Sequence, residues 1–311
     1  MNSIICIAGP TASGKTALAV ELAKLVNGEV VSCDSMQVYR NFNIGTAKPT
    51  LEEMQGIPHH MLDVAAPDED FSVSRYCQLA TPIVDDILSR GKTAIIAGGT
   101  GLYMDALIKG NDFAPYPSTG VREQLETEAD QIGMEAMLER LRTIDPDSAA
   151  RLHLADRKRI IRALEVYLET GETITAHNLR TQAIPPRYSP LYLGLDFEPR
   201  QVLYDRIDLR VGLMLEAGLI AEIQELLDSG IPRKCTAMQA IGYKEFVDAM
   251  ECGGSLEAAA DAVRQSSRHY AKRQLTWFRR NKSIHWLTRT ADTGNCEILE
   301  AARQLLQETD K

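Results

Sequence analysis

The chain has 311 residues, with 34 Lys and Arg against 43 Asp and Glu and a formal net charge of −9, a balance that by itself disfavours a nucleic-acid partner. Its apolar content of 44% supports a buried core, its 25% of charged residues argues against extended disorder, and no apolar run reaches the ~20 residues of a membrane helix. Six separated cysteines without a CxxC pair and a start unlike a signal peptide predict a cytoplasmic protein with neither a zinc site nor disulfides, and a monomer is the default expectation.

Short apolar runs rich in β-branched residues alternate with helical patterns along the chain, which is typical of βα units around a parallel sheet. Strands are predicted at residues 3–8, 30–33, 93–97, 191–195 and 284–287. The first helix is predicted at residues 16–25, and the pattern is mainly helical after residue 204. We therefore predict an α/β fold whose core is a parallel sheet, and the phosphate-binding motif after the first strand, at residues 9–16, makes this core resemble that of the P-loop NTPases.

Two proline-rich stretches, 113–118 and 184–190, enclose a segment with a helical pattern throughout. Helices are predicted there at residues 120–132, 134–144 and 157–170, the last ended by a glycine. Three parts follow from this pattern: the first part of the α/β core at 1–114, an all-helical insertion domain at 115–186, and the second part of the core at 187–311.

The segment after the first predicted strand fits the phosphate-binding motif G-x-x-x-x-G-K-[ST], whose backbone N–H groups surround phosphate oxygens at the start of a helix. Lys15 is expected to contact the terminal phosphate, and Thr16 is the expected ligand of Mg²⁺. The residues predicted to bind a diphosphate or nucleotide are Gly9, Pro10, Thr11, Ala12, Ser13, Gly14, Lys15 and Thr16. The motif predicts phosphate binding, that of ATP included, without identifying the phosphate compound.

Asp34 and Thr100 follow the predicted strands 30–33 and 93–97. Because the carboxyl ends of parallel strands face the ligand crevice, both side chains should lie beside the phosphate loop. No acid ends the strand at 93–97, which is unlike a hydrolytic motor, whereas Asp34 suits a transferase as a general base. Capping of a helix by Asp34 and a purely structural turn at Thr100 remain open alternatives.

Several rare segments occur in the order found in the tRNA dimethylallyltransferases, and the chain resembles this family over almost its whole length. Besides the phosphate loop, these segments are Asp34 to Tyr39, Ile44 to Pro49, His59-His60, Gly98 to Tyr103, Arg162 to Val166, Tyr204 to Val211, Met214 to Leu219, Ala240 to Lys244 and Lys272 to Arg279. The C-terminal Cys/His zinc finger of eukaryotic members is missing, so the bacterial form is the better match.

The resemblance implies transfer of a dimethylallyl group from dimethylallyl diphosphate to N6 of adenosine-37 in tRNA, after the base flips out of its stack. Asp34 would accept the amine proton, Thr100 would hydrogen-bond the leaving oxygen, and Arg206 would contact the diphosphate. Arg206 and Arg210 lie one helical turn apart and share a face, so either can contact the diphosphate or pair with a neighbouring Asp. Arg206 is favoured by its place in the family pattern.

Residues 262–291 contain eight Lys and Arg and no acid, which reverses the expectation drawn from net charge. On a helix, Arg264, Arg268, Lys272 and Arg279 would form one stripe, and a second basic cluster opens the predicted helix at 157. Either cluster can instead be a solvated face. The residues predicted to contact the anticodon stem-loop are Asp34, Ser35, Met36, Gln37, Thr100, Arg122, Lys158, Arg159, Arg162, Gly242, Tyr243, Lys244, Arg268, Lys272, Arg273 and Arg279.

Three other functions share parts of this pattern. A small-molecule or nucleotide kinase would use the phosphate loop and the base, but it has no need of an acid-free basic helix. A prenyltransferase acting on adenylate has less reason for a long tRNA-binding surface. An RNA-binding module with a vestigial nucleotide site leaves Asp34, Gln37 and Thr100 unexplained together.

Overall fold

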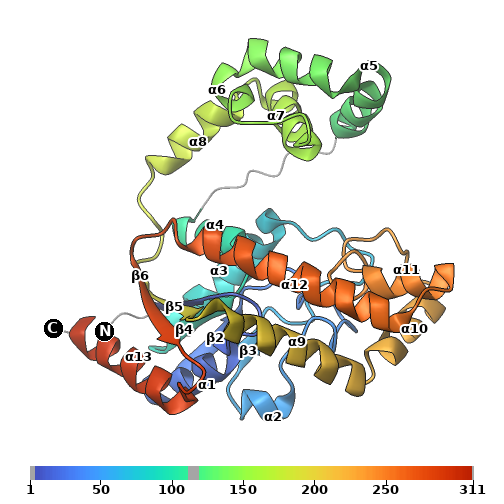
Figure 1. The fold of residues 1–311 in the computed structure, drawn as a ribbon. Coiled ribbons are helices and arrows are strands. Elements are labelled where there is room, and N and C mark those ends of the chain that lie inside the picture. The colour runs from blue at the N-terminus through green and yellow to red at the C-terminus, as the bar shows by residue number, and fades with distance from the viewer. Residues whose placement is uncertain (1–3, 111–118, 310–311) are drawn as a thin grey trace. The chain divides into compact units, whose positions relative to one another are not determined.

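A computed structural model of the chain describes residues 4–110 and 119–309, and the chain divides into two compact units (Figure 1). The first unit contains Met1–Gly110 and Arg187–Lys311, and the second contains Asn111–Pro186. The predicted boundary after residue 114 lies outside the described residues. The other predicted boundary, after residue 186, is also where the two units divide.

The first unit is built on a six-stranded sheet in the order β3-β2-β4-β1-β5-β6, in which every pairing of strands is parallel. The strands are β1 Ile4–Ala8, β2 Gly28–Ser32, β3 His59–His60, β4 Thr93–Gly98, β5 Leu191–Phe197 and β6 Ile284–Arg289. The predicted α/β class and parallel sheet are confirmed. The edge strand β3 was not predicted, because two residues are too few to show an alternating pattern.

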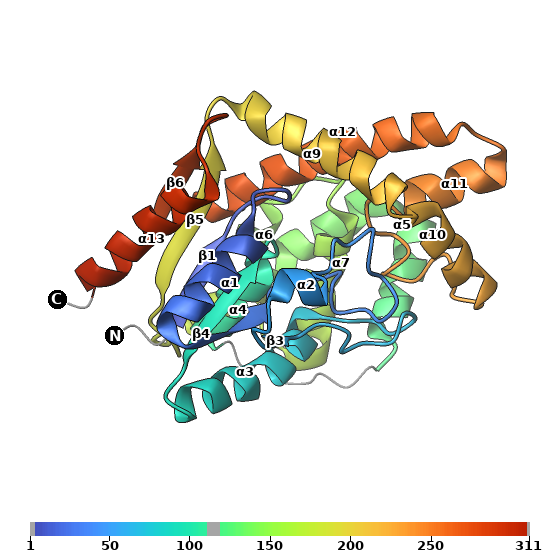
Figure 2. The same cartoon turned by 90° about the horizontal axis from the view of Figure 1, so that it is seen from below.

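Helices cover both faces of this sheet. The helices of this unit are α1 Lys15–Val26, α2 Leu51–Met54, α3 Val73–Ser89, α4 Gly101–Lys109, α9 Arg200–Glu216, α10 Leu219–Asp228, α11 Lys244–Cys252, α12 Leu256–Phe278 and α13 Asn295–Thr309. α1 and α13 pack side by side on one face, whereas α3 and α4 lie on the other (Figure 1 and Figure 2). Ile5, Leu22 and Leu193 are completely buried between the sheet and α1. Among the described residues, no helix is both long and apolar enough to cross a membrane.

The second unit consists of helices around a separate apolar core. They are α5 Val121–Ile144, α6 Pro146–Ala149, α7 Arg157–Thr170 and α8 Ile174–Gln182. Gly133 interrupts α5 with φ +83° and ψ 160°, which agrees with the two predicted helices on either side of it. Met137, Leu141, Ile161 and Leu164 are buried in the core of this unit, which accounts for the helical periodicity of the insertion.

The carboxyl ends of β1, β2 and β4 meet at one edge of the sheet, and the candidate site lies there. Two glycines, one at the end of β4 and one directly after it, allow this close approach. A Cβ atom at Gly98 would overlap the backbone carbonyl of Cys33, and one at Gly99 would overlap the side-chain amide of Gln274. The Gly-Gly-Thr-Gly segment is therefore explained by packing of the β2 loop and of α12 against the end of β4.

Candidate active site

The phosphate loop connects β1 to α1 and borders a cavity of about 580 Å³. Lys15 donates a hydrogen bond to the carbonyl of Pro10 at 2.7 Å, and the N–H of Ser13 donates to the same carbonyl at 3.3 Å. Gly14 adopts a left-handed conformation, φ +88°, directly before the helix begins. The loop therefore brings its backbone, the Lys15 ammonium and the N-terminus of α1 together at the cavity, the arrangement that binds phosphate.

Lys15 has an unusual electrostatic environment. Burial, and to a smaller extent the nearby Arg210, lower the pKa of its ammonium from 10.5 to about 7, while Asp34 has a smaller opposing effect. An anionic group beside Lys15 would stabilise the charged form and raise the pKa again. The lysine is thus placed to gain charge as a phosphate ligand binds.

Two arginines of α9 face the same cavity. Arg206 donates from Nε to the carbonyl of Ala12 at 2.9 Å, and Nη1 of Arg210 lies 3.5 Å from the hydroxyl of Thr11. Burial is the main cause that lowers the pKa of Arg210. Neither guanidinium forms an ion pair with an acid among the described residues, so the structure does not contain the alternative pairing with a neighbouring Asp. Both arginines, and not one of them, lie against the phosphate loop.

Asp34 lines the same cavity as Lys15 and the two arginines. Its Oδ1 accepts a hydrogen bond from the N–H of Met36 at 2.9 Å, which fixes the carboxylate in the loop after β2. No helix begins there, so Asp34 is not a helix cap. Its other carboxylate oxygen has no hydrogen-bond partner among the described residues and is available to a ligand.

Thr100 lies beside the loop that carries Asp34. Its hydroxyl accepts a hydrogen bond from the N–H of Ser35 at 3.0 Å, and it is not among the residues that line the cavity. Thr100 therefore connects the β4–α4 turn to the loop that carries Asp34. Thr100 thereby positions the loop that holds the Asp34 carboxylate, and its contact with a leaving oxygen stays a prediction.

Gln37 lines the cavity, but protein groups engage its amide. Nε2 donates to the carbonyls of Thr46 and Ala47, at 3.3 and 3.0 Å, and Oε1 accepts from the hydroxyl of Ser32 at 3.0 Å. The predicted contact of Gln37 with a base edge would have to replace or share these hydrogen bonds.

Two residues of α12 belong to the site and were not assigned to it from the sequence. Gln274, only 5% exposed, accepts from the N–H of Thr11 at 2.9 Å and donates to the carbonyl of Gly99 at 3.0 Å. It joins the phosphate loop to the β4–α4 turn. Tyr270 lies one turn earlier and lines the cavity; burial raises its pKa to about 12, and hydrogen bonding with Thr100 opposes this shift. In the sequence, the one sign of this role was a Gln at a position of the helix where the periodicity expects a buried apolar residue.

The cavity changes character along α9. Arg206 and Arg210 line its cationic part, whereas Leu209, Leu213 and Met214 line an apolar part, together with Ile44 and Ala217. Leu209 and Leu213 are 64% and 53% exposed, which is high for leucines beside a site. The arrangement can therefore accept a ligand with an anionic head and a short apolar tail.

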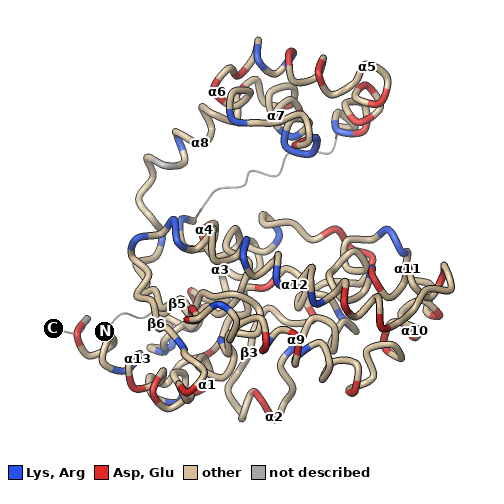
Figure 3. The backbone as a smooth tube through the Cα atoms, in the orientation of Figure 1, with Lys and Arg blue, Asp and Glu red and all other residues tan. Residues whose placement is uncertain are grey.

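The predicted basic stripe lies on a real helix, and basic positions recur along α12 (Figure 3). Three of its four cations form ion pairs with acids, two of which lie far away in the sequence. The pairs are Arg264 with Asp261 at 2.6 Å, Arg268 with Asp208 at 3.2 Å and Arg279 with Asp196 at 2.5 Å. Lys272 and Arg273 are exposed and, in the described part of the chain, form no ion pair.

The second unit carries the other predicted tRNA-contacting cations. Arg122 and Arg162 lie near Glu165, at 4.0 and 2.8 Å, and Arg159 pairs with Asp156 at 3.3 Å. Lys158 is exposed, and no acid within the described ranges pairs with it. These cations therefore remain candidates whose charges are partly balanced within the unit.

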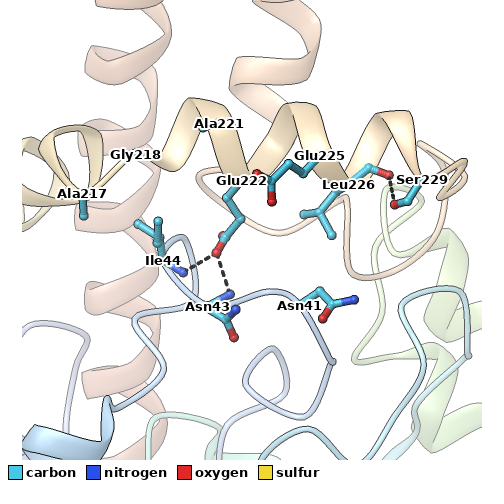
Figure 4. A pocket seen from close by; sticks show the side chains of 10 residues that line it. All are labelled: Asn41, Asn43, Ile44, Ala217, Gly218, Ala221, Glu222, Glu225, Leu226 and Ser229. Atoms are coloured by element: carbon cyan, nitrogen blue, oxygen red, sulfur yellow. Dashed lines mark hydrogen bonds between the residues drawn. The ribbon is translucent and has the colours of Figure 1, made fainter.

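A second cavity, of about 590 Å³, lies between α10 and the loop at residues 41–44, and Glu222 projects into it (Figure 4). The Glu222 carboxylate accepts from the backbone N–H groups of Asn43 and Ile44, at 3.0 and 2.8 Å, and from the Tyr243 hydroxyl at 2.6 Å. Tyr243 is completely buried, so its side chain is not exposed for the predicted contact with tRNA. The ring packs against Gly45, which directly precedes Thr46 and Ala47, the residues whose carbonyls accept from Gln37.

The neighbours of Tyr243 in the predicted tRNA-binding segment also make internal contacts. The N–H of Gly242 donates to Glu245 at 2.9 Å, and the ammonium of Lys244 lies 3.8 Å from the same carboxylate. Lys244 remains partly exposed, so it is the one member of this segment whose side chain can reach a partner directly.

The residues at the cavity fit a magnesium ion held mainly by its substrate. The Thr16 hydroxyl is a hard oxygen donor, which Mg²⁺ prefers. Across residues 4–110 and 119–309, no group of three or more His, Cys, Asp or Glu side chains is arranged to hold a metal. The protein alone therefore offers few metal ligands, and phosphate oxygens would have to supply others.

Comparison with known proteins gives a consistent result. The sequence model of the IPP transferase family matches residues 37–281. A tRNA dimethylallyltransferase from Acetivibrio thermocellus is 44% identical over 307 residues, which cover 98% of each chain. One from Halalkalibacterium halodurans is 45% identical over 300 residues, or 96% of this chain and 95% of the relative.

Solved structures agree with the sequence comparison. A full-length tRNA isopentenylpyrophosphate transferase from Bacillus halodurans has 42% identity and a TM-score of 0.73, with 100% of this chain and 99% of that chain covered. A eukaryotic dimethylallyltransferase acting on tRNA has 31% identity and a TM-score of 0.84, covering 99% of this chain and 78% of that chain.

Proposed function

The chain belongs to the IPP transferase family, and from this premise we propose that it is a tRNA-modifying enzyme that transfers a dimethylallyl group from dimethylallyl diphosphate to N6 of adenosine-37. The observation that carries the proposal is the joint placement of Lys15, Arg206, Arg210 and Asp34 around one cavity with an apolar part. A cationic region suits a diphosphate, the carboxylate suits a proton acceptor, and the leucines suit a prenyl tail.

The donor would bind with its diphosphate against the phosphate loop and its dimethylallyl group along α9. The loop N–H groups, Lys15 and the two arginines would neutralise the diphosphate, and Leu209 and Leu213 would cover the prenyl carbons. Covering these exposed leucines would add hydrophobic stabilisation of about 25 cal/mol per Å² of apolar surface. The enzyme would thereby fix the prenyl C1 between the cations and Asp34.

In the transfer step, the adenine N6 lone pair forms a bond to the prenyl C1 as the bond from C1 to the diphosphate oxygen breaks. The diphosphate leaves with that electron pair, and the N6 proton passes to the carboxylate of Asp34. The cations stabilise the negative charge that grows on the leaving group, where electrostatic catalysis is most effective. The rest of the rate acceleration comes from alignment of the weakly nucleophilic amine with C1, beside a fixed proton acceptor.

Mg²⁺ bound at Thr16 would neutralise part of the diphosphate charge and favour its departure. Thr16 would hold the ion together with oxygens of the diphosphate, which fits the small number of protein ligands around the cavity. The enzyme is also expected to be monomeric and cytoplasmic.

The tRNA would lie along the exposed cations of α12, with the target adenine turned out of its stack into the cavity beside Tyr270. Lys272 and Arg273 are the first candidates for phosphate contacts, because they form no ion pair among the residues that the structure describes. Arg268 and Arg279 would exchange an aspartate partner for a phosphate, which reduces their net contribution to the free energy of tRNA binding.

A matrix of donors and acceptors tests the proposal. The protein is incubated with labelled dimethylallyl diphosphate or labelled ATP, each with unmodified tRNA, with AMP or without an acceptor. Label should enter tRNA only from the prenyl donor, and digestion should release N6-(dimethylallyl)adenosine from position 37. Transfer to AMP would indicate an adenylate prenyltransferase, and phosphate transfer from ATP would indicate a kinase; either result would contradict the proposal.

A further inference from the structure

Arg289 at the end of β6 is a buried cation for which the described part of the protein supplies no counter-charge. Its side chain is only 4% exposed, yet it forms no ion pair among the described residues. Nη1 donates to Oδ1 of Asn295 at 2.8 Å, and Nε is buried without a hydrogen-bond partner in residues 4–110 and 119–309. Buried arginines normally pair with an acid, because an uncompensated buried charge is costly.

This guanidinium points at the phosphate loop. Its Nη2 lies 3.4 Å from the position that a Cβ atom of Gly14 would occupy, and Nη2 of Arg206 lies 4.0 Å from the same position. Two positive side chains thus converge on the residue directly before Lys15. Burial lowers the pKa of Arg289, and the charge of Arg206 lowers it further.

Arg90, another arginine of the first unit, has the acidic partners that Arg289 lacks among the described residues. Arg90 donates to both carboxylate oxygens of Glu29 and also bonds Asp86, and its charge is fully balanced. Arg289 and Arg206 repel one another instead, and both have free donors directed at the N-terminus of α1. An anion bound there would relieve the repulsion and supply the missing acceptors, as a multiply charged phosphate does best.

We propose that Arg289 is a further diphosphate-binding residue of this enzyme, which contacts the leaving diphosphate together with Arg206 from the side of β6. The inference rests on the proposed function, since it names a ligand for the same phosphate loop. It also accounts for one member of the basic stretch 262–291 that does not lie on α12. This cation serves the diphosphate and not the tRNA.

The test measures binding of inorganic diphosphate, with Mg²⁺, to the full chain by titration calorimetry. Arg289→Met removes the charge and keeps an apolar side chain of similar length, and Arg289→Lys keeps the charge. Because charge-assisted hydrogen bonds are lost, we expect Arg289→Met to weaken diphosphate binding by about tenfold to a hundredfold, with partial rescue by lysine. Arg303→Met, on the exposed surface of α13, is the matched control and should change affinity by less than about twofold.

A structural role for Arg289 gives a different pattern. If the arginine only anchors α13 through Asn295, then Asn295→Ala should reproduce the loss of diphosphate affinity, and Arg289→Met should melt at a clearly lower temperature without ligand. We expect the reverse: Asn295→Ala keeps its diphosphate affinity, and Arg289→Met melts at the wild-type temperature or above it, because a buried unpaired charge is removed.

The outcomes separate this inference from the proposed function. If the wild-type protein binds diphosphate and prenylates tRNA while Arg289→Met binds diphosphate equally well, only the role of Arg289 is refuted. If the wild-type protein does not bind diphosphate, both are refuted. The inference is supported if Arg289→Met loses affinity for diphosphate while Asn295→Ala and Arg303→Met keep the affinity of the wild-type protein.

Discussion

The lowered pKa of Lys15 makes diphosphate binding dependent on pH in a way that one substitution isolates. In the free protein burial brings this pKa to about 7, against 10.5 for an ordinary lysine. A diphosphate beside the ammonium favours its charged form, so binding at or above neutral pH takes up a proton. Lys15→Arg removes this proton uptake, because a guanidinium stays protonated throughout the range.

The size of the effect follows from the two pKa values. Above pH 7 the fraction of protein with a charged Lys15 falls about tenfold per pH unit. If binding restores the ordinary pKa, diphosphate affinity should fall about fiftyfold from pH 7 to pH 9, or about 2.3 kcal/mol. At pH 7 about half a proton should be taken up per diphosphate bound. Below pH 6 this dependence should disappear, because Lys15 is then charged in both states.

Titration calorimetry in two buffers with different ionisation enthalpies measures the proton uptake directly. Inorganic diphosphate also titrates in this range, but its contribution is common to the wild type and to Lys15→Arg. The difference between the two proteins therefore reports the lysine alone. Equal pH slopes and equal proton uptake in both proteins would refute the reasoning, because Lys15 would then be charged before the ligand binds.

Further substitutions test the supports of the site and the proposed tRNA-binding surface. Gln274→Met should lower the free energy of unfolding by about 1–3 kcal/mol, measured by urea denaturation, because two buried backbone groups lose their partner; an unchanged midpoint would contradict this. Glu222→Gln should destabilise by a similar amount, whereas Glu225→Gln in the same cavity should not, and equal effects would show that the hydrogen bonds of Glu222 are unimportant. Lys272→Ala should reduce the slope of log affinity for tRNA against log salt by about 0.7–0.9, measured by filter binding. Arg268→Ala should reduce it less, because its aspartate partner already balances the charge, and a larger effect of Arg268 would reverse this assignment.

The parts of the site that lie close together in sequence were predictable. The phosphate loop follows a strand and opens a helix, so its spacing alone fixed its place, and Asp34 was placed by the rule that parallel strands end at one edge. Arg206 and Arg210 share a helix face for a similarly local reason. These predictions needed only the periodicity of strands and helices.

The remaining features depend on contacts between distant segments. Gln274 meets Thr11 across 263 positions, and nothing in the sequence around either residue indicates the pairing. The stretch 262–291 contains no acid, yet Asp208 and Asp196 neutralise two of its arginines after folding. Thr100 was correctly brought beside the Asp34 loop, but the direction of its hydroxyl depends on the backbone of Ser35. Such details require the tertiary structure.

The central claim is that Asp34 accepts a proton from N6 of a tRNA adenine while the phosphate loop holds the leaving diphosphate. The most direct measurement compares Asp34→Asn with the wild type for single-turnover transfer of labelled dimethylallyl to tRNA, with tRNA and diphosphate affinities measured on the same samples. Asparagine keeps the hydrogen bond to Met36 and loses the basic oxygen. We predict that transfer falls by about a hundredfold or more while both affinities stay within about threefold. Transfer at the wild-type rate by Asp34→Asn would contradict the claim.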